Sequence, residues 1–256
     1  MFAIVANPVA HVRTPQVFNE YFRAHGIDAV LVPVEVSPER LPAMLDGFRA
    51  MTNLAGFVAT MPHKTAMVGL CDEVTRTARL IGAANTVRRD PDGRLVGTMF
   101  DGDGFVAGLR AQGHEPRGRR VYLAGAGGAA SAIAFAFAEA GVACLTLHNR
   151  TTSKAAELAD RVRAACPHVA VSVGSADPSG HELVINGTSL GLKPDDALPI
   201  DTAKLTPDMV VGEVVMLPET TALLAAATAR GCPIHHGRHM LDEQIRLMAA
   251  FMGATG

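Results

Sequence analysis

The stretch of residues 121–154 constrains the fold more than any other part of the chain. It reads as an apolar strand, a glycine-rich turn, a long alanine-rich helix and a second apolar strand. Glycines at a strand-to-helix turn let the backbone close tightly, and they let a pyrophosphate approach the N–H groups at the helix N-terminus. Ala130 stands at the third glycine of the G-x-G-x-x-G pattern, which tolerates alanine there. The stretch therefore predicts a βαβ unit that binds a dinucleotide.

The residues after the second strand of this unit indicate which dinucleotide fits. Proteins that use NAD place Asp or Glu there, about 20 residues beyond the glycines, to bind the ribose 2′-OH. This chain has Asn149, Arg150 and Thr151, then Lys154, and no carboxylate before Glu157. A guanidinium grips a 2′-phosphate bidentately, whereas a carboxylate repels it. NADP is therefore favoured. NAD stays the alternative because an asparagine can still bond a 2′-OH.

Composition places the chain among compact globular proteins, with 48% hydrophobic and 19% charged residues. The net charge of -2 implies no general surface for nucleic acid. The four cysteines are scattered without the spacing of a metal or disulfide site, which predicts reduced thiols, a cytoplasmic location and no metal. No leader is expected, and no uncharged run reaches the roughly 18 residues of a membrane span. We expect a monomer or homodimer that binds a small molecule.

The pattern of strands and helices changes near Asp101. Before it strands and helices alternate irregularly, and after it a regular βαβα pattern takes over. Strands are expected at residues 2–5, 29–36 and 56–60, followed by a hairpin at 85–88 and 95–98. A helix is expected after Thr14, a plausible N-cap, with Pro15 at its first position. We therefore predict an α/β fold with two domains, divided between residues 101 and 102.

A reductase that acts on a carbonyl needs a group to give or take the hydroxyl proton. Lys64 follows the strand at 56–60 behind Pro62, where a rigid turn could aim it into a cleft. Asp101, after the last strand of the first domain, could supply a carboxylate that holds the lysine charge. The plain alternative is two surface charges. His63 is another candidate acid or base, although a solvated side chain is the ordinary interpretation there.

Nine short motifs occur in the order found in the shikimate dehydrogenase family, which the chain resembles over almost its whole length. They are NPVAH at 7–11, TMPHK at 60–64, GAANTV at 82–87, DG at 101–102, GAGGA at 125–129, NRT at 149–151, NGT at 186–188, PETT at 218–221 and GRHML at 237–241, followed by Gln244. The resemblance implies a substrate domain of residues 1–101, with a mixed sheet, completed by 237–256. It implies an NADP-binding Rossmann domain of residues 102–236, and reversible reduction of 3-dehydroshikimate to shikimate, or a close analogue, by NADPH.

The resemblance also implies roles for individual residues. Lys64 and Asp101 match the catalytic pair of the family. Four residues match substrate-binding positions: Thr14, Thr60, Asn85 and Gln244. From the residues alone, Asn85 would only serve a turn and Gln244 would lie at the edge of a core face. The cofactor positions are Gly125, Ala126, Gly127, Gly128, Ala129, Asn149, Arg150, Thr151, Lys154, Thr188 and Gly237.

The departures from the family pattern fall mostly on the substrate side. Val12 replaces a serine, so one of two hydroxyls expected to hold the substrate carboxylate is missing. The others are Val58 for Asn, Phe100 for Thr, Glu213 for Asp and Met216 for Tyr. Quinate, aminoshikimate or a less polar relative are therefore alternative substrates. A non-catalytic nucleotide-binding module is an alternative of another class, against which the retained proton-transfer pair argues. A methylene-tetrahydrofolate dehydrogenase is disfavoured by the motifs at 82–87 and 237–244.

Overall fold

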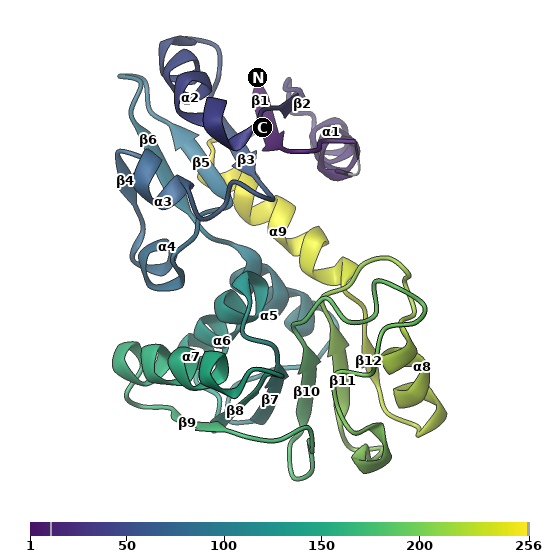
Figure 1. Ribbon diagram of the computed structural model, residues 1–256. Coiled ribbons are helices and arrows are strands. Elements are labelled where there is room, and N and C mark those ends of the chain that lie inside the picture. Colours follow the sequence, from purple (N-terminus) through teal and green to yellow (C-terminus); the bar gives the residue numbers. More distant parts are fainter. Residues whose placement is uncertain (11, 255–256) are drawn as a thin grey trace. The chain divides into compact units, whose positions relative to one another are not determined.

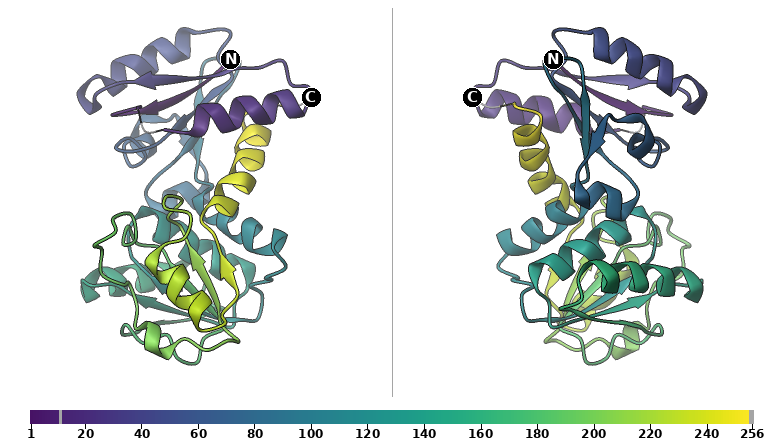
Figure 2. Two further views of the ribbon diagram at one scale, coloured as in Figure 1. Left: turned by 90° about the vertical axis from the view of Figure 1, so that its right-hand side faces the viewer. Right: turned by 90° about the vertical axis from the view of Figure 1, so that its left-hand side faces the viewer.

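The computed structural model describes residues 1–10 and 12–254, and the chain divides into two compact units (Figures 1 and 2). The first unit comprises Met1–Phe100 and Ile245–Gly256, and the second comprises Asp101–Gln244. Each unit has its own six-stranded sheet with helices packed on it. The predicted α/β fold is confirmed. Within the described residues, no helix has the length and apolar character that crossing a bilayer requires.

The first unit is built on a mixed sheet with the strand order β2-β1-β3-β5-β6-β4. Its strands are β1 (Phe2–Ala6), β2 (Leu31–Glu35), β3 (Gly56–Ala59), β4 (Glu73–Val74), β5 (Thr86–Arg89) and β6 (Leu95–Thr98). β1 runs parallel to β2 and β3, whereas β5 is antiparallel to β3 and β6. Its helices are α1 (Thr14–Ala24), α2 (Leu41–Ala50), α3 (Met67–Leu70) and α4 (Arg76–Ile81), with a 3₁₀ turn at Pro38–Arg40. The predicted hairpin is present as β5 and β6.

Aromatic side chains fix α1 against β1. Phe18 and Phe22 lie four residues apart and therefore share one face of the helix. Their ring centroids are 5.6 Å apart, and Phe22 lies 5.4 Å from the ring of Phe2. The helix begins at Thr14, with Arg13 in the N-cap position and no side-chain capping bond. The prediction that Thr14 caps this helix is therefore wrong, because Thr14 already belongs to its first turn.

The second unit is built on a parallel sheet with the order β12-β11-β10-β7-β8-β9. Its strands are β7 (Arg120–Ala124), β8 (Cys144–His148), β9 (Ala170–Val173), β10 (Leu183–Asn186), β11 (Val210–Glu213) and β12 (Ile234–His235). Its helices are α5 (Asp101–Ala111), α6 (Gly128–Ala140), α7 (Thr152–Ala165) and α8 (Ala222–Ala229), with a 3₁₀ turn at Thr202–Lys204. The last helix, α9 (Arg238–Phe251), has residues in both units.

The strand order of the second unit reverses between β7 and β10. The chain runs outward through β7, β8 and β9, and then returns to add β10, β11 and β12 on the other side of β7. In open parallel sheets of this kind, ligands bind beyond the carboxyl ends of the strands at such a reversal. The glycine-rich turn follows β7, so it stands at this point. The predicted Rossmann unit is confirmed.

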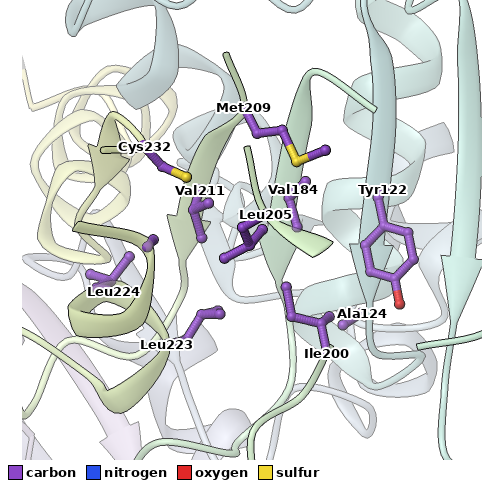
Figure 3. Packing of buried hydrophobic residues seen from close by; sticks show 11 residues of the cluster. Tyr122, Ala124, Val184, Ile200, Leu205, Met209, Val211, Leu223, Leu224 and Cys232 are labelled. Atoms are coloured by element: carbon purple, nitrogen blue, oxygen red, sulfur yellow. The ribbon is translucent and has the colours of Figure 1, made fainter. Parts of the chain in front are cut away.

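Both faces of this sheet are covered by apolar packing. On one face, Tyr122, Val184 and Val211 pack with Leu223 and Leu224 of α8 in a buried cluster (Figure 3). Side chains alternate between the two faces of a strand, so the neighbouring residues point to the helices opposite. There α5 and α6 approach closely. Gly102 permits this approach because it has no Cβ, which would lie only 2.1 Å from the carbonyl oxygen of Ala132. This packing holds the carboxyl ends of β7, β10 and β11 in fixed positions.

Candidate functional site

The turn between β7 and α6 forms an open cradle of backbone N–H groups. Gly127 is the N-cap of α6 and makes no side-chain capping bond, so the first N–H groups of the helix have no partner within the helix. A Cβ at Gly127 or Gly128 would meet no atom within 4 Å, which leaves room for a ligand beside the backbone. Gly125 has a φ of 117°, a conformation that suits glycine. This geometry fits a pyrophosphate at a helix N-terminus.

Polar and basic side chains follow β8, the strand beside β7. The backbone N–H of Gly125 donates to the carbonyl of His148 at 2.7 Å, which ties the end of β8 to the glycine turn. Asn149 donates through Nδ2 to the carbonyl of Thr151 at 2.9 Å and so shapes the turn into α7. Arg150 and Lys154 are exposed. Two exposed cations therefore follow the strand whose end is tied to the glycine turn.

A buried carboxylate organises the ends of β10 and β11. Glu213 is fully buried, and its carboxylate accepts hydrogen bonds from Asn186, Thr221 and the backbone of the next two residues. Burial raises the pKa of Glu213, and the hydrogen bonds oppose this shift. Thr188 donates from its N–H and its hydroxyl to Oδ1 of Asn186 at 2.9 and 2.7 Å. Sequence reasoning missed this cluster, although a polar residue at the end of each of two adjacent strands was a usable signal.

In the first unit, Thr60, Lys64 and Asn85 are gathered where the central strand β3 ends and its antiparallel neighbour β5 begins. Thr60 follows β3, and its N–H donates to the carbonyl of Val5 at 3.0 Å. The carbonyl of Lys64 accepts from the N–H of Ala84 at 2.9 Å, so the turn that carries the lysine is fixed to the segment before Asn85. The side chain of Lys64 is half-buried. The structure thus brings three of the predicted site residues together.

Hydrogen bonds hold the Asn85 amide and the His63 ring in place. Oδ1 of Asn85 accepts from the N–H of Phe100 at 3.1 Å and from the hydroxyl of Thr86 at 2.9 Å. Asn85 is 1% exposed, and this bonding fixes the plane of its amide. His63 is also 1% exposed, with Nε2 at 3.0 Å from the carbonyl of Val36. The expectation of a solvated His63 is therefore wrong, because its ring turns inward to this carbonyl.

Asp101 and Gln244 form a buried pair within the second unit. Asp101 is the first residue of α5, and its Oδ1 accepts from Nε2 of Gln244 at 2.7 Å. The two residues are 3% and 7% exposed. A carboxylate in the first turn of a helix is also favoured by the helix dipole. Gln244 is therefore not a polar residue at the edge of a core face, but a direct hydrogen-bond partner of Asp101.

Thr14, Thr188 and Gly237 complete the predicted set. Thr14 is half-buried at the start of α1, and Thr188 lies in the turn after β10. Gly237 packs directly on backbone, since a Cβ there would lie 2.5 Å from the carbonyl oxygen of Val215. Among the residues that the structure describes, no three His, Cys, Asp or Glu side chains are arranged to hold a metal ion.

Known proteins share both the sequence pattern and the fold. The model of the shikimate dehydrogenase substrate binding domain matches residues 4–87. The shikimate dehydrogenase (NADP(+)) of Rubrobacter xylanophilus is 39% identical over 248 residues, which cover 95% of this chain and 87% of that protein. The ligand-free 5-ketofructose reductase of Gluconobacter sp. strain CHM43 has a TM-score of 0.92 at 34% identity, covering 99% and 93% of the two chains. The shikimate 5-dehydrogenase of Listeria monocytogenes, in complex with shikimate and NAD, has a TM-score of 0.91 at 30% identity, covering 98% and 91%.

Proposed function

This chain belongs to the shikimate dehydrogenase family, and from that premise we propose that it is an NADP-dependent oxidoreductase. It reversibly reduces 3-dehydroshikimate, or a close analogue, to the corresponding alcohol. The observation that carries this proposal is the combination, in one unit, of an open glycine cradle with the buried Asp101 carboxylate held by Gln244. A cradle alone would suit any nucleotide-binding module, whereas a buried, oriented carboxylate suits proton-transfer chemistry.

We propose that the residues at the carboxyl ends of β7, β8 and β10 hold the cofactor. Bound NADPH would supply the hydride. The five residues from Gly125 to Ala129 would hold its pyrophosphate with backbone N–H groups. Arg150 and Lys154 would neutralise the 2′-phosphate, with Asn149 and Thr151 beside the ribose. Thr188 and Gly237 belong to the turns at the opposite end of the dinucleotide site. NAD is the alternative cofactor.

Lys64 and Asp101 are proposed as the proton-transferring pair. Reduction of a carbonyl places a hydride on carbon and needs a proton on oxygen, which the Lys64 ammonium would give. Oxidation of the alcohol would return that proton to Lys64. Asp101 would favour the charged form of the lysine and orient the reacting hydroxyl. Thr14, Thr60, Asn85 and Gln244 would bind the remaining polar groups of the substrate, and Gln244 would at the same time fix Asp101.

A second candidate substrate is an uncharged polyhydroxylated ketone. Val12 and Met216 bring no hydroxyl to two positions where the family carries Ser and Tyr. Each hydrogen bond lost to a charged group is worth about 1.5–3 kcal/mol, so a carboxylate would be held less well. The structural similarity to a 5-ketofructose reductase, at 34% identity, also favours an uncharged ketone as the substrate. In either case we propose that the substrate is a small molecule. We also propose that the protein is located in the reducing cytoplasm, which its four free thiols support, and that it is a monomer or homodimer.

Initial rates with a panel of substrates test the proposal. Shikimate and quinate would be offered with NADP and with NAD, and 5-ketofructose would be offered with NADPH and with NADH. Rapid oxidation of shikimate with NADP is expected for the first candidate, and faster reduction of 5-ketofructose for the second. Nucleotide binding without turnover of any of these substrates would instead support the non-catalytic module.

A further inference from the structure

The Glu213 cluster joins two turns of the second unit. We use this name for Glu213, Asn186, Thr221 and the backbone N–H groups of Val214 and Val215. The Glu213 carboxylate lies 2.9 and 3.1 Å from Nδ2 of Asn186, 3.0 Å from the Thr221 hydroxyl, and 2.9 and 3.0 Å from the two N–H groups. All of these groups donate. The site therefore suits an ionised carboxylate, which accepts at both oxygens.

Asn186 connects Glu213 to the turn after β10 by hydrogen bonds. Its Nδ2 group donates to Glu213 and to the carbonyl of Leu190 at 2.9 Å. Its Oδ1 accepts from the N–H and the hydroxyl of Thr188. The Thr188 hydroxyl in turn accepts from the N–H of Leu190 at 3.0 Å. The conformation of the 186–190 turn therefore depends on the side chain that closes β11.

Glycines bring neighbouring backbone directly against this cluster. A Cβ at Gly125, in the cofactor cradle, would lie 2.9 Å from the carbonyl carbon of Gly187. A Cβ at Gly237 would lie 2.5 Å from the carbonyl oxygen of Val215. The cradle, the 186–190 turn, the 213–215 turn and the start of α9 thus form a continuous packed series. A shift of one turn would displace the next, because packed interiors have little free space.

The position of the cluster specifies which half of a dinucleotide it affects. Arg150 and Lys154 follow β8, on one side of the reversal, and the cradle follows β7 at the reversal itself. β10 and β11 lie on the other side. A dinucleotide bound across the reversal with its 2′-phosphate at β8 has its nicotinamide end over β10 and β11. We propose that Glu213 is a positioning residue that holds the turns after β10 and β11 in the conformation that seats the nicotinamide half of NADP. This inference rests on the proposed cofactor site.

Substitution of Glu213 by glutamine tests the inference while keeping the size of the side chain. The amide offers one acceptor oxygen and places its NH₂ group against donors, so the two turns lose their common anchor. Each unsatisfied buried donor is costly, so the dissociation constant for NADPH should rise about tenfold or more. Affinity for adenosine 2′,5′-bisphosphate, which has no nicotinamide, should stay within about twofold of wild type. The fluorescence of bound NADPH should fall toward that of free NADPH.

Glu182→Gln provides a matched control in the same sheet, at the strand next to that of Glu213. Glu182 directly precedes β10 at its other end, where it accepts from the N–H of Arg120 at 3.1 Å. This variant loses a carboxylate bond to the sheet but should bind both nucleotides as wild type does. The inference is overturned if Glu213→Gln binds NADPH normally, or if it weakens both nucleotides equally, which would indicate only a loss of structure.

A second pair of variants covers the case in which Glu213→Gln does not fold. Thr221→Val removes one donor to Glu213, and Thr221→Ser retains it. The valine variant should lose NADPH affinity selectively, and the serine variant should restore it. Equal NADPH affinity in both would contradict the inference. Because these are binding measurements, they remain decisive if none of the expected substrates is turned over, and that result would count only against the proposed reaction.

Discussion

At the scale of single residues, His235 is an unusual buried group. It is fully buried in β12, and among the described residues neither ring nitrogen finds a hydrogen-bond partner. Its ring lies 5.3 Å from the ring of Phe105 and 5.0 Å from that of His239. Burial, followed by the nearby His239, His114 and His236, lowers the pKa of His235 to about 3. The neutral ring is therefore the form that the fold accepts.

This pKa predicts a specific dependence of stability on pH. Below an unfolded-state pKa of about 6.5, the unfolded chain binds a proton that the folded chain excludes down to about pH 3. The free energy of unfolding should therefore fall by about 2 kcal/mol between pH 7.5 and 5 on account of His235. His235→Leu should remove this part of the dependence, and urea unfolding at the two pH values measures it. His25→Gln, an exposed control at the C-cap of α1, should retain the wild-type slope, and an equal slope in His235→Leu would refute the assignment.

The sequence singled out candidate site residues but did not indicate which side chains they contact. The resemblance singled out Asp101, Asn85 and Gln244, but the bond between Asp101 and Gln244 joins positions 143 residues apart. No local pattern encodes such a contact. Glu213 was noted only as a departure from the family, since burial of a carboxylate depends on tertiary packing. The same reason explains why His63 was expected in solvent.

At the scale of elements, α1 protects an edge of the first sheet. β2 is an edge strand, and Asn19 of α1 accepts from the N–H of Leu31 at 2.8 Å and donates to its carbonyl at 3.0 Å. Two residues further along the strand, Pro33 has no N–H to offer. The edge therefore presents few groups that could pair with a strand of another chain.

Removal of the Asn19 amide should expose this edge. Asn19→Ala leaves the N–H and carbonyl of Leu31 without their partner, which should lower the free energy of unfolding by about 1–3 kcal/mol. Chemical unfolding measures this loss, and light scattering at high protein concentration reports the expected rise in association. Gln16→Ala, an exposed position on the same helix, should change neither property. An Asn19→Ala protein as stable as the Gln16→Ala control would show that the edge does not depend on this contact.

The turn after β8 should determine the preference between the two dinucleotides. Arg150→Ala removes a cation that would pair with the 2′-phosphate, so the ratio of kcat/KM for NADP to that for NAD should fall about tenfold or more. Arg117→Ala removes an exposed arginine from the loop before β7, at the amino-terminal ends of the parallel strands. It should leave the ratio unchanged. An unchanged ratio in Arg150→Ala would exclude this residue from 2′-phosphate recognition.

At the scale of the whole molecule, the longer strands and helices could be predicted from the periodicity of the sequence, whereas the shortest elements could not. The strands predicted for the first sheet lie close to their observed ranges, because runs of apolar residues are local signals. The glycine turn is a local signal of the same kind in the second sheet. β4 has two residues and exists only through its pairing with β6, so no sequence pattern could indicate it. The predicted strand at 29–36 begins instead at Leu31, because the N–H of Ala29 turns back to the carbonyl of Ile27.

The most direct test of the proposed function compares wild type with Lys64→Ala in two assays on the same preparations. The rate of NADP reduction with the best substrate of the panel should fall by about 10²–10⁴-fold in the variant, as expected for loss of a proton-transferring group. The dissociation constant for NADPH should stay unchanged, because the proposed cofactor residues all belong to the other unit. Undiminished turnover by Lys64→Ala would contradict the assignment of Lys64 and, with it, the proposed chemistry of the pair.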